Sequence, residues 1–373
     1  MKIVYSISGT YSAAGMERVL SDKANYLVQM GFHVVILTTD QKNRPPYFAL
    51  DERIQCIDLG INYCDDQRKG LFSKILSYRT KTRMHKKKLR QILPEIKADI
   101  TISMFDHDAD LLWRVDDGSK KILEIHFSRF KRLQYDRKGL WKLVDRWRSK
   151  QDGRVAKRYD RFVVLTEEDR TDWGRIPNIC VIPNAVSFPH NDLSTGESKQ
   201  VIAVGRYNHQ KNFGALIQAW QLVHGQRPDW YLRIYGDGEL KAFYQQQIDQ
   251  LNLQDVITLC PTTQDIQQAY QQSAILAMSS RYEGLPMALL EAQACGLPLV
   301  SFACKCGPKD IILEGKNGLL VDPGDIKGLA QALLKLMGDE SLRKAMGAFS
   351  AKQAALYTKP IIMRSWINLF KGL

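Results

Sequence analysis

Two glutamates and two cations stand beside apolar runs in the second half of the chain. Glu283 and Glu291 lie in SSRYEGLPMALLEAQACGLPLV, where an apolar run precedes Glu283 and a proline and a glycine bracket a helix carrying Glu291. The first turn of a helix has unpaired N–H groups and the positive end of the dipole, which attract anions and hydroxyl oxygens. Two such glutamates alone are more often a turn residue and a solvated one, so their meaning depends on what accompanies them.

Arg206 and Lys211 accompany them upstream, in VIAVGRYNHQKNFGALIQAW. This segment predicts a strand, a loop and a helix, which places both cations at the carboxyl end of a strand. In an open parallel sheet, ligands bind at that edge. A guanidinium and an ammonium together suit a diphosphate, whereas either one alone is more often a solvated surface charge.

The pattern Gly-Arg-x4-Lys-Asn at 205–212, followed by Glu-Gly-Leu-Pro-x4-Glu at 283–291, resembles the family 4 retaining glycosyltransferases. The resemblance covers essentially the whole chain. It extends to three further short motifs: Gly236-Asp237-Gly238, Ile182-Pro183-Asn184 and Gly15-Met16-Glu17.

The resemblance implies a role for each matching residue in binding a nucleotide-sugar donor. Arg206 and Lys211 would bind the diphosphate, and Glu291 the ribose hydroxyls. His126 ends the apolar run KKILEIH, where a lone histidine is more often structural; the resemblance instead implies that it positions the donor sugar and shares the catalytic work with Glu283, Arg206 and Lys211. The other implied donor contacts are Gly15, Gly205, Gly236, Glu283, Gly284 and Leu285.

Strands alternate with helices along the chain, which predicts α/β domains with parallel sheets. The polar, turn-rich segment SFPHNDLSTGESKQ interrupts the alternation. We therefore expect an N-terminal acceptor-binding domain at 1–185, a linker at 186–199 and a nucleotide-sugar-binding domain at 200–355. The resemblance implies the GT-B arrangement, two doubly wound Rossmann-like domains facing across a cleft, and a final helix at 356–373 that returns to the first domain.

Composition is that of an ordinary soluble protein, with 45% hydrophobic and 25% charged residues among 373. No apolar run is long enough for a transmembrane helix, and the N-terminus MKIVYSISGT is too short and polar for a signal peptide. Seven cysteines, an odd number, do not suggest a disulfide framework. A cytoplasmic location is expected.

The net charge of +13 is concentrated in one region, because residues 69–161 hold 26 Lys and Arg against 12 Asp and Glu. The densest basic run is 79–90, and it includes Lys86, Lys87 and Lys88. Such a helix suits an anionic membrane surface, a nucleic acid or simply solvent. Interleaved Phe130, Trp141 and Trp147 favour the membrane, so we expect a peripheral enzyme at its inner face and no nucleic-acid partner.

Asp106 and Asp108 form an Asp-x-Asp pattern of the kind that holds a divalent metal in another glycosyltransferase architecture. They lie in the first domain, while the diphosphate cations lie in the second. We therefore expect Asp106 to cap a helix and face the acceptor, and we expect no metal or other cofactor.

The predicted reaction transfers a sugar from a nucleotide diphosphate donor, expected to be UDP-linked, to a saccharide hydroxyl of a lipid-linked or cell-surface polysaccharide intermediate. Two other functions fit parts of the sequence. A nucleotide-sugar epimerase of similar fold would bind the same donor without an acceptor. A non-catalytic membrane- or nucleic-acid-binding protein would use the basic region, but would leave the phosphate-binding pattern without purpose.

Overall fold

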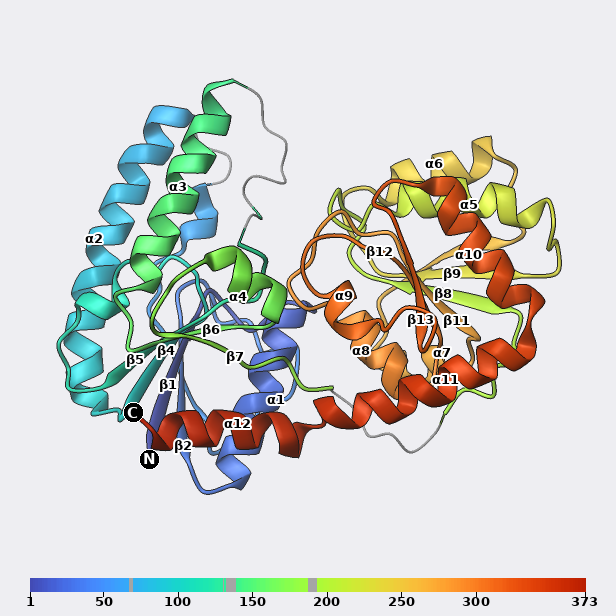
Figure 1. Cartoon of the computed structure of the whole chain (residues 1–373). Coiled ribbons are helices and arrows are strands. Elements are labelled where there is room, and N and C mark those ends of the chain that lie inside the picture. The colour runs from blue at the N-terminus through green and yellow to red at the C-terminus, as the bar shows by residue number, and fades with distance from the viewer. Residues whose placement is uncertain (67–69, 130, 132–138, 187–192) are drawn as a thin grey trace. The chain divides into compact units, whose positions relative to one another are not determined.

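The chain folds into two α/β units, which Figure 1 shows in the computed structural model. The structure describes residues 1–66, 70–129, 131, 139–186 and 193–373. Unit 1 contains Met1–Leu165, Arg170–Ile182 and Met363–Leu373, and unit 2 contains Thr166–Asp169 and Pro183–Ile362. Much of the expected linker, residues 187–192, lies outside the described residues, as does Phe130.

Within the described residues, unit 1 is built on a seven-stranded parallel sheet of order β3-β2-β1-β4-β5-β6-β7. The order reverses between β1 and β4, which is the doubly wound arrangement. The strands are β1 (Lys2–Ile7), β2 (His33–Thr38), β3 (Gln55–Asp58), β4 (Ile100–Ser103), β5 (Lys120–Glu124), β6 (Arg161–Val164) and β7 (Ile179–Val181).

The longer helices of unit 1 cover this sheet through an apolar stripe. In α1, for example, Val19, Leu20, Leu27 and Val28 are buried. The helices are α1 (Gly15–Gln29), η1 (Tyr63–Asp66), α2 (Leu71–Ile96), η2 (Leu112–Arg114), α3 (Leu140–Ala156), α4 (Glu167–Trp173) and the final α12 (Lys359–Lys371). Figure 1 draws α12 against unit 1, to which residues 363–373 belong.

Unit 2 repeats the plan with a parallel sheet of order β10-β9-β8-β11-β12-β13. The strand order reverses between β8 and β11. Its strands are β8 (Gln200–Val204), β9 (Tyr231–Tyr235), β10 (Ile257–Cys260), β11 (Ile275–Met278), β12 (Leu299–Phe302) and β13 (Gly318–Val321). The inner strands β11 and β12 are buried on both faces, as expected for a parallel sheet, whereas β9 exposes alternate residues.

The helices of unit 2 are α5 (Phe213–His224), α6 (Lys241–Gln250), α7 (Ile266–Gln271), α8 (Met287–Ala294), α9 (Pro308–Ile311), α10 (Ile326–Gly338), α11 (Glu340–Ala354) and η4 (Ala355–Tyr357). Of these, α5, α6, α10 and α11 pack on the buried core that includes Trp220, Leu232, Ile234 and Phe302. Among the described helices of both units, none is long and apolar enough to cross a bilayer.

Candidate active site

One predicted cation and one predicted carboxylate meet in unit 2, where the strand order reverses. Lys211 lies in the loop after β8, and Glu283 lies in the loop after the neighbouring strand β11. Lys211 Nζ is 2.7 Å from Glu283 Oε1, and the two side chains are 18% and 7% exposed. The carboxyl edge at such a reversal is the usual ligand site of an open α/β sheet.

Hydrogen bonds join these two loops and fix the backbone on which the ion pair is built. Asn212 Nδ2 donates to the Ser279 carbonyl over 3.2 Å, and Ser279 Oγ donates to the Lys211 carbonyl over 3.0 Å. Gln210 Nε2 donates to the Tyr282 carbonyl over 3.0 Å. Because Asn212 has a φ of +52° where α5 begins, the chain turns sharply between Lys211 and the helix.

Gly205 and Gly236 are needed for close packing at this edge. A Cβ on Gly205 would lie 2.8 Å from Lys211 Cε, so the lysine stem crosses the bare backbone there. A Cβ on Gly236 would lie 1.9 Å from the Gly205 carbonyl oxygen. The absence of a side chain at both glycines therefore allows Lys211 to occupy its position.

Glu291 is buried on α8 rather than solvated. Its Oε2 accepts a hydrogen bond of 3.0 Å from the hydroxyl of Tyr270, at the end of α7. Tyr270 was not singled out from the sequence, because an aromatic residue in a short helix gives no signal beyond that of a core residue.

Arg206 differs from Lys211 in being exposed. Its guanidinium forms no hydrogen bond or ion pair with another residue in the described part of the chain. Gly284 and Leu285 continue the loop from Glu283 to the start of α8, with Leu285 buried. The loop after β11 therefore places backbone groups next to the Lys211–Glu283 pair. The loop after β8 adds one solvated cation, Arg206.

His126 lies in unit 1, two residues beyond the end of β5. Its side chain is 7% exposed, and Nε2 lies 3.1 Å from Oε1 of Glu124, at ion-pair distance but without hydrogen-bond alignment. Lys23 of α1 contacts the same carboxylate, with Nζ 2.8 Å from Oε1 and 2.6 Å from Oε2. Neither Glu124 nor Lys23 was predicted from the sequence.

Gly15, the other predicted donor residue of unit 1, is the first residue of α1 and is exposed. Since α1 follows β1, Gly15 lies on the carboxyl side of the sheet, like His126.

The prediction that Asp106 caps a helix is wrong. Residues 106–111 form turns that lead into the short η2. Asp106 Oδ1 accepts a hydrogen bond of 2.8 Å from the His107 N–H and lies 3.7 Å from His107 Nε2. Asp108, two residues on, is fully buried. Burial, followed by the charge of Asp106, raises the pKa of Asp108 to about 7.

The predicted basic cluster on α2, Lys86 to Lys88, is only partly exposed to solvent. Lys87 is exposed, whereas Lys86 and Lys88 are half-buried and Lys88 Nζ donates to the Leu59 carbonyl. The same helix buries His85, and burial, reinforced by His107, lowers the pKa of His85 to about 4.

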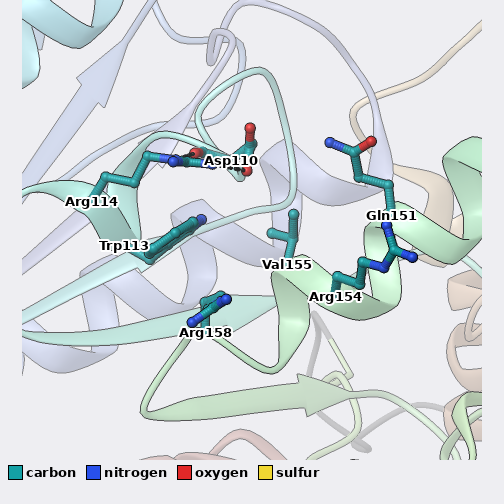
Figure 2. Close-up of a pocket in the computed structure, with 7 residues that line it drawn as sticks. All are labelled: Asp110, Trp113, Arg114, Gln151, Arg154, Val155 and Arg158. Carbon is teal, nitrogen blue, oxygen red and sulfur yellow. Dashed lines mark hydrogen bonds and ion pairs between the residues drawn. The ribbon is translucent and has the colours of Figure 1, made fainter.

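A surface pocket of about 310 Å³ in unit 1 contains none of the predicted site residues (Figure 2). Arginines line it beside one indole: the guanidinium carbons of Arg114 and Arg158 lie 4.2 and 5.4 Å from the Trp113 ring centroid. Arg154 contributes a further cation from α3. In the sequence, the local excess of positive charge is the only signal for this surface.

Comparisons with known proteins agree with the fold and with the motifs. Residues 13–188 match the family described as Glycosyltransferase Family 4, and residues 189–353 match Glycosyl transferases group 1. An uncharacterized glycosyltransferase of Haemophilus influenzae is 29% identical, with 98% of each chain covered.

Two further similarities also span nearly the whole chain. The Campylobacter jejuni GalNAc-alpha-(1->4)-GalNAc-alpha-(1->3)-diNAcBac-PP-undecaprenol alpha-1,4-N-acetyl-D-galactosaminyltransferase is 25% identical over 99% of this chain and 98% of its own. A mutant of S. aureus TarM, solved with fondaparinux, alpha-GlcNAc-glycerol and UDP, has a TM-score of 0.81 and 17% identity over 99% of each chain. The chain has the GT-B fold and belongs to glycosyltransferase family 4.

Proposed function

We propose that this glycosyltransferase moves a sugar, with retention of configuration, from a UDP-linked donor to a saccharide hydroxyl of a lipid-linked or cell-surface polysaccharide intermediate. The observation that carries the donor assignment is the Lys211–Glu283 ion pair at the strand-order reversal of unit 2, with Arg206 on the same loop as Lys211. The UDP in the TarM structure and the undecaprenol-linked acceptor in the name of the Campylobacter relative support the donor and acceptor classes.

Arg206 and Lys211 bind the diphosphate in this proposal and stabilise the charge that develops on it as the sugar leaves. The Glu291 carboxylate accepts hydrogen bonds from the ribose hydroxyls. Glu283, with the backbone of Gly284 and Leu285, orients the sugar. His126 contacts the donor sugar from unit 1. Since Lys211 already neutralises Glu283, that carboxylate is better suited to orienting a sugar than to attacking it.

The acceptor hydroxyl forms a bond to the anomeric carbon on the face from which the diphosphate leaves. The bond between the anomeric carbon and the diphosphate oxygen breaks, and the hydroxyl proton passes to the departing phosphate oxygen. No metal takes part, because two cations supply the countercharge. This mechanism follows the family resemblance; the positions of Lys211 and Arg206 support its electrostatic part.

A screen of nucleotide sugars tests the function. UDP-sugars should raise the melting temperature, because a ligand that binds only the folded state stabilises it by RT ln(1 + [L]/Kd). The stabilising donor should then support transfer to a lipid-linked saccharide, with unchanged rate in excess EDTA. An epimerised sugar formed without acceptor would identify an epimerase instead. Loss of activity in EDTA with rescue by Mn²⁺ would overturn metal independence.

A peripheral membrane location is supported by exposed apolar side chains on the basic helices of unit 1. Ile75, Leu76 and Tyr78 on α2 are 47%, 69% and 48% exposed, and Leu143 and Trp147 on α3 are 60% and 59% exposed. Both helices pack on one core cluster through their carboxyl-terminal halves. The same two helices carry exposed basic residues: Arg79, Lys87, Lys142, Arg146 and Arg148.

The purified protein should therefore sediment with phosphatidylcholine vesicles that contain phosphatidylglycerol, and be released as salt rises. Each basic residue near such a surface contributes about 1 kcal/mol, so Arg79→Glu/Lys87→Glu should weaken binding by more than about tenfold. Lys241→Glu/Lys335→Glu, which changes the net charge equally with exposed residues of unit 2, is the control. Equal binding to neutral vesicles would contradict the proposal.

A further inference from the structure

A buried ion pair in unit 1 lies beside His126. Lys23 of α1 and Glu124 at the end of β5 have side chains that are 5% and 1% exposed. Removing two charges from water is costly, and a buried pair is often replaceable by hydrophobic residues without loss of stability. Stability alone therefore explains this pair poorly.

Electrostatics keeps the Glu124 carboxylate ionised. Burial alone would raise the pKa of Glu124, but the charge of Lys23, followed by the neighbouring His126, lowers it to about 2. Burial lowers the pKa of Lys23, and Glu124 offsets part of this effect. A charged carboxylate is thus present next to the imidazole at neutral pH.

One oxygen of Glu124 serves both neighbours. Oε1 lies 2.8 Å from Lys23 Nζ and 3.1 Å from His126 Nε2. The contact with His126 lacks hydrogen-bond alignment. Catalytic hydrogen bonds are often poorly aligned before substrate binds, and a small rotation of the ring would align this one. A carboxylate at this distance favours the imidazole tautomer that has its proton on Nε2.

The other side of Lys23 is covered by aromatic rings. Its Nζ lies 3.5 Å from the centroid of the Trp366 ring in α12, and 5.4 Å from that of Tyr5 in β1. Both aromatic residues are fully buried. Cation–π contacts of a desolvated ammonium are among the stronger ones. The final helix of the chain therefore fixes where the ammonium lies, and through it the carboxylate.

We propose that Glu124 is a positioning residue for His126, and that Lys23, held against Trp366 of α12, fixes the Glu124 carboxylate. The geometry that carries this is a continuous set of buried contacts from α12 through α1 to the loop after β5. The inference rests on the proposed role of His126 at the donor sugar, and it adds the residues that set the orientation and tautomer of the imidazole.

The test replaces both charges at once, because removal of one would leave the other buried and unpaired. In Lys23→Met/Glu124→Leu, kcat should fall by about 10²-fold, the cost of a misplaced reacting group. The melting temperature and the KM for the donor should stay close to the original values. The matched control is Lys121→Met/Asp117→Leu, a second buried ion pair (8% and 1% exposed) at the amino end of the same strand, which should keep full activity.

Two readouts separate positioning from a general structural effect. Adding His126→Ala to Lys23→Met/Glu124→Leu should cost no further activity, because residues that act as a unit are non-additive. The imidazole carbon-bound proton signals of His126, assigned by its loss in His126→Ala, should shift in Lys23→Met/Glu124→Leu and not in the control.

Wild-type kcat in Lys23→Met/Glu124→Leu, alongside a large loss in His126→Ala, would overturn the positioning role and leave the proposed function standing. An equal fall in kcat in the control variant would also overturn it, by attributing the loss to any broken ion pair of β5. Full activity in His126→Ala would contradict the role of the histidine and this inference together. The proposed sugar transfer would still be tested independently by the screen of nucleotide sugars.

Discussion

Arg206→Ala should lower the rate of sugar transfer by about 10²-fold or more, the usual cost of losing one group that stabilises charge in the transition state. The fold should be unaffected, because the Arg206 side chain is exposed, and surface substitutions typically change stability by less than about 0.5 kcal/mol. Steady-state kinetics and thermal unfolding of the same preparation check both parts. Arg233→Ala, an exposed arginine within β9, is the matched control and should behave as wild type.

Lys211→Met should lose at least as much activity, but with a second consequence. It leaves Glu283, 7% exposed, without its ion-pair partner, so the melting temperature should also fall. Comparing the two variants distinguishes the electrostatic effect from the structural one. Near-normal turnover in Arg206→Ala and Lys211→Met together would remove the diphosphate assignment.

The elements of the fold could be predicted because each strand is a short apolar run bounded by turn residues. KIVYSI, ITIS and QVIAV all form strands of the two sheets. What local pattern could not give is the order of the strands, since β1 pairs with β2 and also with β4, which begins about a hundred residues along the chain. That order decides which loops become neighbours.

The meeting of Lys211 with Glu283 illustrates the same point at the site. Their types and their positions after strands predicted that both would lie on the carboxyl edge of one sheet. Only the adjacency of β8 and β11 brings Nζ and Oε1 to 2.7 Å. The role of each in binding a donor stays a prediction.

Contacts made by ordinary-looking residues could not be predicted. Lys23 lies at helical spacing from Val19, Leu20 and Leu27, on the apolar face of α1, but the sequence does not indicate which residues would pair with a lysine there. It is buried because Glu124 and Trp366, which are distant in the chain, converge on it. Asp106 was assigned wrongly for a related reason: an Asp after a strand often caps a helix, but here the chain forms successive turns before η2.

Asp108, in those same turns, is a buried carboxyl group that carries a measurable consequence for stability. Neither of its oxygens makes a well-aligned hydrogen bond to a described residue. Burial and the neighbouring Asp106 raise its pKa to about 7, while the nearby hydroxyls of Ser103 and Ser6 offset only part of the rise. In the unfolded chain an aspartate has a pKa of about 3.9, so the folded state holds this proton more tightly.

A raised folded-state pKa contributes stability that is present below the unfolded value and is lost as pH rises through the folded value. The free energy of unfolding should therefore lose a contribution from Asp108 between about pH 4 and pH 7. Asp108→Asn removes that dependence, so its stability relative to wild type should be higher at pH 8 than at pH 5 by about 2–3 kcal/mol. Urea unfolding at the two pH values measures the difference. Asp110→Asn, on the same stretch of turns but 47% exposed and paired with Arg114, should show no such change. An Asp108→Asn effect equal at both pH values would mean that the buried carboxyl group is ionised throughout, contrary to its burial without aligned partners.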